Sequence, residues 1–328
     1  MSVKSSKDIS IELLRQSNEA QANPKEIFGI ANFGTDWPIL NKLSRGLQHK
    51  TFTVLMARPK VGKSMLVSQW VPDLALQAQE AGKVLRIVTL ETTMTTYQQR
   101  TASQLAGIRD PLRIRAGYLD AEERKRYKQA LKTLHELPIE YLSNEYDMTE
   151  EQALIGGYSA IGLDQIEQFI RQQDTFLWVI DHMGLINRKS MGKGPTEQLE
   201  AISNRLAILS TRYVGGIGIT HLNRNSLDGG VPSFENIAGT DVFARDPGAL
   251  YFLWRPFFES RRKTPEDLEM MEAMGGDPGL LIFKSRNEGD GSVGLFWSKE
   301  YASFTETDKR EGEIPLPGGG RPRRGGAH

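Results

Sequence analysis

Short runs of apolar and β-branched residues recur along the chain and alternate with segments whose apolar residues are spaced three or four apart. The short runs predict buried strands, and the spaced segments predict amphipathic helices. Strands are predicted at residues 52–57, 84–90, 139–142, 176–180, 216–220, 249–254, 280–284 and 293–297. Because strands that alternate with helices need crossover connections, the pattern predicts an α/β fold with a mostly parallel central sheet flanked by helices.

The same pattern divides the chain into three regions. Residues 1–36 are polar except for an apolar cluster between 9 and 14, which predicts either one short helix of an N-terminal arm or a frayed tail. The main domain is expected over 37–304. Residues 305–328 are rich in Gly and Pro and carry several arginines, which predicts a disordered basic tail.

Composition narrows the class of protein. The chain of 328 residues is 39% hydrophobic and 25% charged, as expected for a globular protein with an ample core. It has no apolar run near the roughly 18 residues of a membrane span and no apolar signal-peptide region, so we expect a cytoplasmic protein. The absence of cysteine excludes disulfides and thiolate zinc sites. A net charge of zero means that any nucleic acid must bind to a local basic surface.

The strand at 52–57 runs directly into a glycine- and lysine-containing turn that opens a helix. Backbone amides and a helix N-terminus converge in such a turn, which favours a phosphate-binding P-loop over a chance Gly-Lys-Ser. Lys63 would reach the β- and γ-phosphates of a nucleotide, and Ser64 would hold Mg²⁺. The first position is Ala57, where the general pattern has Gly, and Ala is costly there only if the residue needs positive φ. The candidate phosphate-binding residues are Ala57, Arg58, Pro59, Lys60, Val61, Gly62, Lys63 and Ser64.

Three later strands end in polar residues. Glu91 follows a strand expected to neighbour the P-loop strand, where its carboxylate could polarise the water that attacks the γ-phosphate or could simply be a surface group. Asp181 follows an apolar run in the Walker B pattern, whose Asp binds the water shell of Mg²⁺. His221 ends the strand at 216–220 and could either hydrogen-bond a γ-phosphate or be structural.

Two loops and one turn carry further candidate contacts. The segment 187–195 is basic and without acids, which suits contact with a phosphate backbone, although a solvated loop is the alternative. Residues 223–239 form a polar loop that could touch a ligand or DNA. The candidate DNA-binding residues of these loops are Arg188, Lys189, Lys193, Asn223, Arg224, Asn236 and Gly239. Lys284 and Arg286 stand in i, i+2 register, hence on one side of a strand.

In order and spacing, these motifs resemble the DnaB-like replicative helicases, the RecA-type ring ATPases of helicase superfamily 4. The resemblance covers about residues 37–304. It rests on the segments 57–64, 89–91, 113–119, 180–182, 220–224 and 284–287. Ala57 is similar to the family's own P-loop variant, and His221 is similar to the phage ring helicases, where DnaB has Gln. The segment 234–240 departs from the family because it lacks the Arg-Glu-Ser-Gly run of DnaB.

The resemblance implies a homohexameric ATP-dependent DNA helicase that uses Mg²⁺, unwinds duplex DNA and works with a separate primase and a loader. ATP would bind at subunit interfaces, with Lys63, Ser64, Glu91, Asp181 and His221 acting within one subunit. Lys284 and Arg286 would reach the neighbouring subunit's nucleotide as arginine-finger elements.

By the same resemblance, both polar loops would line a channel for single-stranded DNA, and the N-terminal arm would dock on the adjacent subunit. Two other classes fit the motifs. One is a RecA- or KaiC-like remodelling ATPase that does not unwind DNA, and the other is a nucleotide-gated DNA-binding scaffold or loader.

Overall fold

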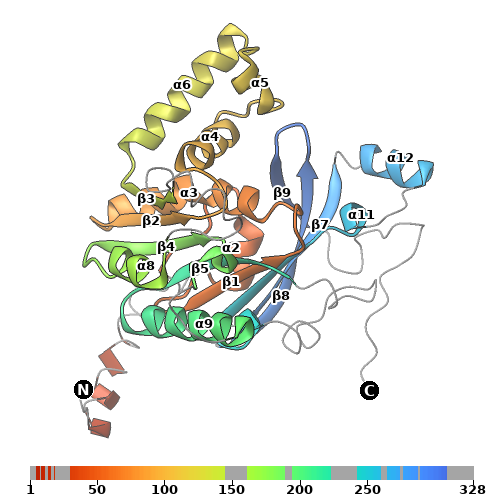
Figure 1. The fold of residues 1–328 in the computed structure, drawn as a ribbon. Helices are drawn as coiled ribbons and strands as arrows, with labels where there is room; N and C mark the ends of the chain where they lie inside the picture. Colours follow the sequence, from red (N-terminus) through yellow and green to blue (C-terminus); the bar gives the residue numbers. More distant parts are fainter. Residues whose placement is uncertain are drawn as a thin grey trace.

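A computed structural model describes residues 5–7, 9–11, 14–15, 18, 30–144, 161–188, 194–222, 242–259, 264–273, 276–286 and 289–308. Its centre is a nine-stranded sheet with the order β3-β2-β4-β5-β1-β6-β7-β8-β9 (Figure 1). The strands are β1 (Phe52–Ala57), β2 (Val84–Thr89), β3 (Ile139–Ser143), β4 (Thr175–Asp181), β5 (Gly216–His221), β6 (Ala249–Trp254), β7 (Asp277–Ser285), β8 (Gly289–Ser298) and β9 (Ser303–Thr307).

The strands from β3 to β6 in this order pair in parallel, whereas β6 to β9 form an antiparallel extension. Every residue of β1, β4 and β6 is buried, as expected for strands covered on both faces. The prediction of a mostly parallel α/β sheet flanked by helices is therefore confirmed. The sheet also contains β9, which the sequence pattern did not predict and which extends the sheet to Thr307.

Helices cover the two faces of the sheet and form a core on each (Figure 1). The helix α3 packs on one face, and α8 and α9 pack on the other. The helical elements are α2 (Pro38–Ser44), α3 (Lys63–Glu80), α4 (Met94–Leu105), α5 (Leu112–Ala116), α6 (Ala121–Glu136), α8 (Leu163–Ile170), η2 (Met183–Leu185), α9 (Pro195–Arg212), η5 (Val242–Ala244), α11 (Pro256–Glu259) and α12 (Pro265–Ala273). Among the described residues, no helix combines the length and apolar character needed to cross a membrane.

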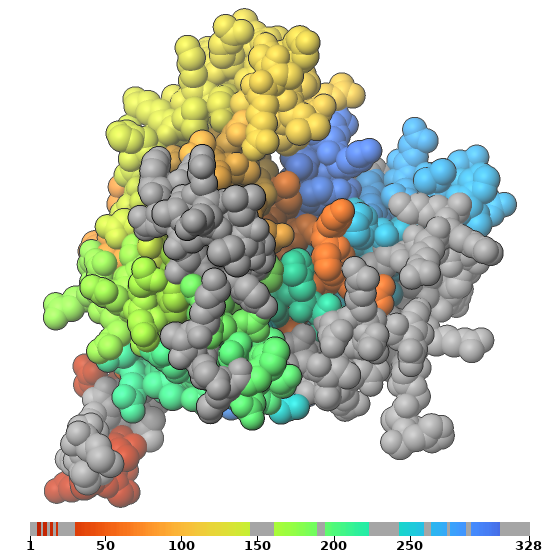
Figure 2. All heavy atoms as spheres, in the orientation of Figure 1, coloured from red at the N-terminus to blue at the C-terminus, as the bar shows by residue number. Residues whose placement is uncertain are grey.

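The segments α4 to α6 form a helical lobe with a small core of its own. Its α5 and α6, coloured yellow, stand above the rest of the molecule in Figure 2. The helix α6 begins with a capping box in which Asp120 and Glu123 satisfy each other's backbone amides. The lobe follows directly after Glu91, so it begins at the edge of the sheet where the P-loop lies.

The two ends of the domain meet beside α3. Phe33 is fully buried in the main core, and Ala31 pairs with Leu47 in an isolated bridge. The carboxylate of Glu306, in β9, accepts hydrogen bonds of 2.9 and 2.8 Å from the backbone amides of Ile39 and Leu40 at the start of α2. The last strand thus caps a helix near the start of the domain. Of the disordered tail predicted over 305–328, residues 305–307 belong to β9 instead, because they pair with β8. Residues 309–328 lie outside the described residues.

Trp178 in β4 tests how strongly the core supports the sheet. Its ring is fully buried, and its Nε1–H donates to the carbonyl of Val214 at 2.9 Å. We expect Trp178→Ala to lower the free energy of unfolding by about 3–5 kcal/mol, because it leaves a cavity and an unpaired carbonyl. Leu76→Ala, at an exposed site on α3, should change it by about 0.5 kcal/mol or less. Urea unfolding followed by circular dichroism measures both, and equal losses would contradict the prediction.

Candidate functional site

The P-loop lies between β1 and α3, as the sequence predicts. Gly62 precedes the helix with φ +114°, a backbone conformation that favours glycine, and an added Cβ would come within 3.0 Å of the Phe304 ring. Ala57 is not among the described residues with positive φ, so the alanine is compatible with the turn. The helix that follows presents its N-terminal amides and positive dipole end at the carboxyl edge of the sheet, a setting that favours an anion.

Lys63 holds its ammonium group inside this turn. The side chain is 4% exposed, and Nζ donates to the carbonyls of Ala57 at 3.3 Å and Arg58 at 3.2 Å. Nζ also lies 2.8 Å from Nδ1 of His221. Burial lowers the pKa of Lys63 to about 8, against the opposing effects of Asp181 and Glu91. The charge is therefore poorly solvated and is suited to a phosphate partner.

Asp181 ends β4 beside the start of α3 and is fully buried. Burial raises the pKa of its carboxyl group, while the nearby Ser64 hydroxyl and Arg100 favour the ionised form. Neither carboxylate oxygen has a hydrogen-bond partner of good geometry among the described residues. Two buried, unsatisfied carboxylate oxygens next to a hydroxyl are the oxygen ligands that Mg²⁺ prefers, so these two residues fit the predicted metal site.

Glu91 lies beyond the end of β2, with its backbone amide donating to the Asp181 carbonyl at 3.4 Å. The prediction that its strand neighbours the P-loop strand is wrong, since β4 and β5 lie between β2 and β1. The carboxylate nevertheless reaches the cluster because β2 pairs with β4 in register, with Thr89 opposite Asp181. Glu91 is exposed, so water has access to it.

Two histidines complete the cluster. His221 ends β5 opposite Ala57, and His182 follows Asp181 directly, with their ring centroids 4.4 Å apart. Burial lowers the pKa of His182 to about 3 and that of His221 to about 4, with nearby Lys63 adding to both shifts, so both rings are neutral at pH 7. A ring nitrogen of each histidine and a carboxylate oxygen of Glu91 lie within 4.8 Å of one another. The sequence motifs predict Glu91 and His221 but assign no role to His182.

Arg255 supports the P-loop from behind and has no signal in the sequence. It is 4% exposed, and its Nη1 donates to the Val61 carbonyl at 2.9 Å. Its Nε and Nη2 donate to Asp277 Oδ2 at 3.1 and 2.5 Å. The guanidinium carbon also lies 4.9 Å from the centroid of Trp297, from the antiparallel extension. This ion pair joins β6, β7 and the P-loop.

Lys284 and Arg286 lie away from this cluster. Lys284 pairs with Leu250, which itself pairs with Val54 near the start of β1. The backbone amide of Arg286 donates to the carbonyl of Gly248 at 2.9 Å. Gly248 precedes β6, and its own amide donates to the carbonyl of Phe52 at the start of β1. Five residue steps of about 3.3 Å along β1 separate this edge from the P-loop. The two cations are exposed, Lys284 beside Asp290 at 3.7 Å and Arg286 donating to the Arg245 carbonyl at 2.8 Å.

The predicted DNA-binding residues fall mostly outside the described part of the chain. Arg188 is described and follows η2, beyond the carboxyl end of β4. The residues outside the described ranges are Lys189, Lys193, Asn223, Arg224, Asn236 and Gly239. The last described residues before these gaps, Arg188 and Leu222, follow β4 and β5 at the edge of the sheet that carries the P-loop.

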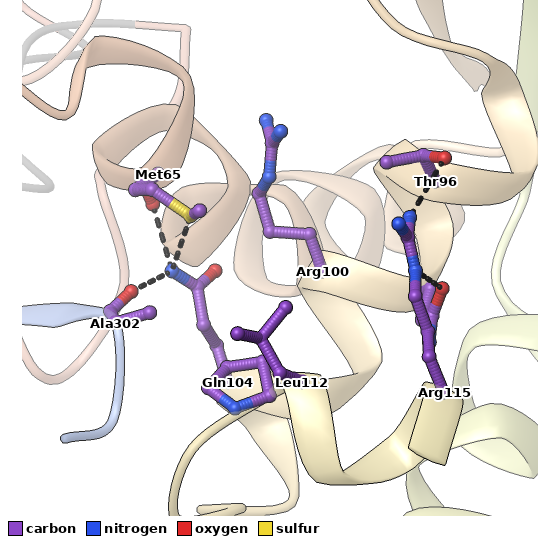
Figure 3. Close-up of a pocket in the computed structure, with 9 residues that line it drawn as sticks. Met65, Thr96, Arg100, Gln104, Leu112, Arg115 and Ala302 are labelled. Atoms are coloured by element: carbon purple, nitrogen blue, oxygen red, sulfur yellow. Dashed lines mark hydrogen bonds between the residues drawn. The ribbon is translucent and has the colours of Figure 1, made fainter. Parts of the chain in front are cut away.

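A cavity of about 270 Å³ lies between the P-loop helix and the helical lobe (Figure 3). The amide nitrogen of Gln104 donates across it to the carbonyls of Met65 at 3.1 Å and Ala302 at 2.7 Å. Arg100 and Arg115 also line it (Figure 3). None of the predicted nucleotide-contacting side chains faces this cavity, so it is separate from the P-loop cluster.

These features define a RecA-like P-loop NTPase domain. They are the parallel sheet, the P-loop, and the acidic and histidine side chains at the carboxyl edge of the sheet. Residues 33–306 match the family model of the DnaB-like helicase C terminal domain, and the chain belongs to this family.

Known relatives agree with that assignment. The chain is 22% identical to the replicative DNA helicase DnaB of Rickettsia typhi over 317 residues, which are 91% of this chain and 61% of that protein. It is 24% identical to the DnaB of Geobacillus stearothermophilus over 324 residues, 96% of this chain and 65% of that protein. The chain thus spans less than two thirds of the length of these relatives.

Solved structures share the fold. One of them, described as an ATPase domain, matches with a TM-score of 0.71 and 17% identity, covering 92% of this chain and 99% of that one. A DnaB-like replicative helicase, described with its interactions with primase, matches with a TM-score of 0.67 and 17% identity. The match covers 89% of this chain and 65% of that one.

Arg255→Met tests the support behind the P-loop. The substitution removes the guanidinium group that pairs with the buried carboxylate of Asp277, so we expect a loss of about 3–5 kcal/mol in the free energy of unfolding. Lys132→Met removes an exposed ion pair with Glu136 on α6 and should cost about 1 kcal/mol or less. Urea unfolding compares the two variants. A loss at Arg255 no larger than at Lys132 would contradict the proposed support.

Proposed function

We propose that this chain is the motor domain of a replicative DNA helicase that hydrolyses ATP with Mg²⁺ and moves on single-stranded DNA. The observation that carries the proposal is the convergence of Lys63, Asp181, Glu91 and His221 at one edge of the sheet. Membership of the DnaB-like family supports DNA as the substrate on which this ATPase acts.

Each residue of the cluster has a role in this proposal. Lys63 binds the β- and γ-phosphates, for which it must leave the carbonyls of Ala57 and Arg58. Ser64 and Asp181 hold Mg²⁺, which neutralises charge on the phosphates. Glu91 accepts a proton from the attacking water, and His221 donates a hydrogen bond to the γ-phosphate.

We further propose that the working form is a homohexameric ring with the nucleotide at subunit interfaces. Lys284 and Arg286 lie at the edge of the sheet opposite their own P-loop, which supports action on a neighbour's nucleotide. The described residues of the N-terminal arm include Ile9, Ile11 and Leu14, whose apolar side chains are 48%, 58% and 64% exposed. By the family resemblance, this arm would bind the adjacent subunit.

DNA and protein partners complete the proposal. Two polar loops would line a central channel for single-stranded DNA. The first carries Arg188, Lys189 and Lys193, and the second carries Asn223, Arg224, Asn236 and Gly239. A primase is proposed as a separate partner because a protein of similar fold is described with its interactions with primase. A loader is proposed by resemblance to the family, and a cytoplasmic location is proposed as the place where this motor acts.

Glu91→Gln tests the ATPase chemistry. Because a general base acts in the transition state, we expect kcat to fall by about 10²–10⁴-fold while the Kd for ATP stays nearly unchanged. The matched control is Glu272→Gln on the exposed helix α12, which should leave both unchanged. Steady-state hydrolysis and binding of fluorescent nucleotide measure the two quantities. Near-normal turnover of Glu91→Gln would refute its role as the base.

Mixed rings test the trans role of Arg286. We expect Arg286→Ala alone to lower kcat by about 10³-fold, because an arginine finger stabilises transition-state charge. Mixing Arg286→Ala subunits with Glu91→Gln subunits should restore activity, since some interfaces then combine an intact finger with an intact base. Rings verified by mass spectrometry provide the sample. An absence of any recovery would leave Arg286 as a structural residue bound to Arg245.

DNA assays separate helicase action from the other two classes. A helicase unwinds a forked duplex in an ATP-dependent manner. A RecA- or KaiC-like remodelling ATPase hydrolyses ATP without unwinding, and strand exchange would identify a pairing activity. A nucleotide-gated scaffold assembles with ATP but hydrolyses it negligibly. The ATPase cluster favours the first class over the scaffold because a scaffold has no need of Glu91.

A further inference from the structure

His182 is the one member of the polar cluster to which the proposed ATPase chemistry gives no role. Its ring is 9% exposed and forms the N-cap of η2, where Nδ1 accepts a hydrogen bond from the Gly184 amide at 3.1 Å. Gly184 packs so closely against the ring that an added Cβ would lie 2.8 Å from Cε1 and 3.1 Å from Nδ1. The ring is therefore held in one place by the turn that follows β4.

The hydrogen bonds of the two histidines determine where their protons lie. A neutral imidazole that accepts a hydrogen bond at Nδ1 carries its proton on Nε2. His182 accepts from the Gly184 amide, and His221 faces the ammonium group of Lys63, which has only donors. Both histidines therefore present an Nε2–H group as their remaining donor.

This arrangement suits an anion better than a metal ion. A histidine binds a metal through an unprotonated ring nitrogen, and here the unprotonated Nδ1 of each ring is already occupied. Two carboxylates of the cluster can accept from the Nε2–H groups, and that of Asp181 is assigned to the proposed metal site. The other is the carboxylate of Glu91, one oxygen of which lies within 4.8 Å of a ring nitrogen of each histidine.

We propose that His182 is a positioning residue for Glu91, with its Nε2–H donating to the carboxylate and orienting it toward the attacking water. The proposal rests on the role of Glu91 as the base in the proposed function. His221 is committed to Lys63 and to the phosphate, whereas His182 is tied to the backbone of its own turn. During hydrolysis the water proton passes to Glu91, the water oxygen bonds to the γ-phosphorus and the bond to ADP breaks. The His182 proton stays on Nε2.

Two amide substitutions separate this role from capping of η2. The Gln side chain can place an N–H donor near the position of Nε2, so His182→Gln should keep kcat within about threefold of the wild type. Asn is a good helix cap but is too short to carry that donor, so His182→Asn should lower kcat by about 10- to 100-fold. In both variants KM and the Kd for ATP should change by about threefold or less, because the lost contact acts on Glu91 rather than on the nucleotide.

Matched measurements make the result decisive. His135→Asn, the same change at an exposed position on α6, should leave kcat unchanged. Gly184→Ala should lower kcat in the same direction as His182→Asn, because its Cβ displaces the His182 ring. Wild-type kcat in His182→Asn would overturn the proposal. Equal losses in the Gln and Asn variants would also overturn it, because packing alone would explain them, and so would a rise in KM with unchanged kcat.

The Glu91→Gln background distinguishes this proposal from the proposed function. Since His182 acts through Glu91, adding His182→Asn to Glu91→Gln should lower the residual kcat no further. A further loss in the double variant would overturn the positioning role while leaving Glu91 as the base. Near-normal turnover of Glu91→Gln alone would instead refute the base assignment on which the proposal rests.

Discussion

The candidate nucleotide site depends on the burial of the Lys63 ammonium group. Its burial removes water from the charge, and two P-loop carbonyls and His221 replace only part of that hydration. The pKa of Lys63 is accordingly lowered to about 8. An anionic group such as a phosphate would restore the lost stabilisation, so the electrostatics of the site favour an anion.

The parallel sheet determines which side chains surround that charge. The strands β1, β2, β4 and β5 all end at one edge, and in-register pairing brings Ala57 beside His221 and Thr89 beside Asp181. Residues separated by more than a hundred positions thus meet around Lys63. The antiparallel extension has the opposite consequence, since the end of β7 returns Lys284 and Arg286 to the far edge. One domain therefore carries the two halves of the proposed composite site on opposite edges.

A second layer of contacts holds this edge in place. Arg255 connects Val61 of the P-loop to Asp277 of β7, and the ring of Phe304 in β9 limits the space around Gly62. In the turn after β4, a hydrogen bond from the Gly184 amide to Nδ1 holds the His182 ring. These residues lie in the strands and turns next to the motifs, so the geometry of the motifs depends on segments that carry no motif themselves.

The sequence alone determined the α/β class, the position of the P-loop and the strand ends that carry Glu91, Asp181 and His221, because apolar periodicity and P-loop chemistry are local properties. The strand order, β9 and the buried pair of Arg255 with Asp277 were decided only by the tertiary structure. Each of these depends on pairing between distant segments, where register and packing rather than local propensity select the partner. The tertiary structure also decides which ring nitrogen of His182 carries the proton. The backbone amide of Gly184, in the turn after β4, donates to Nδ1 and so leaves the proton on Nε2.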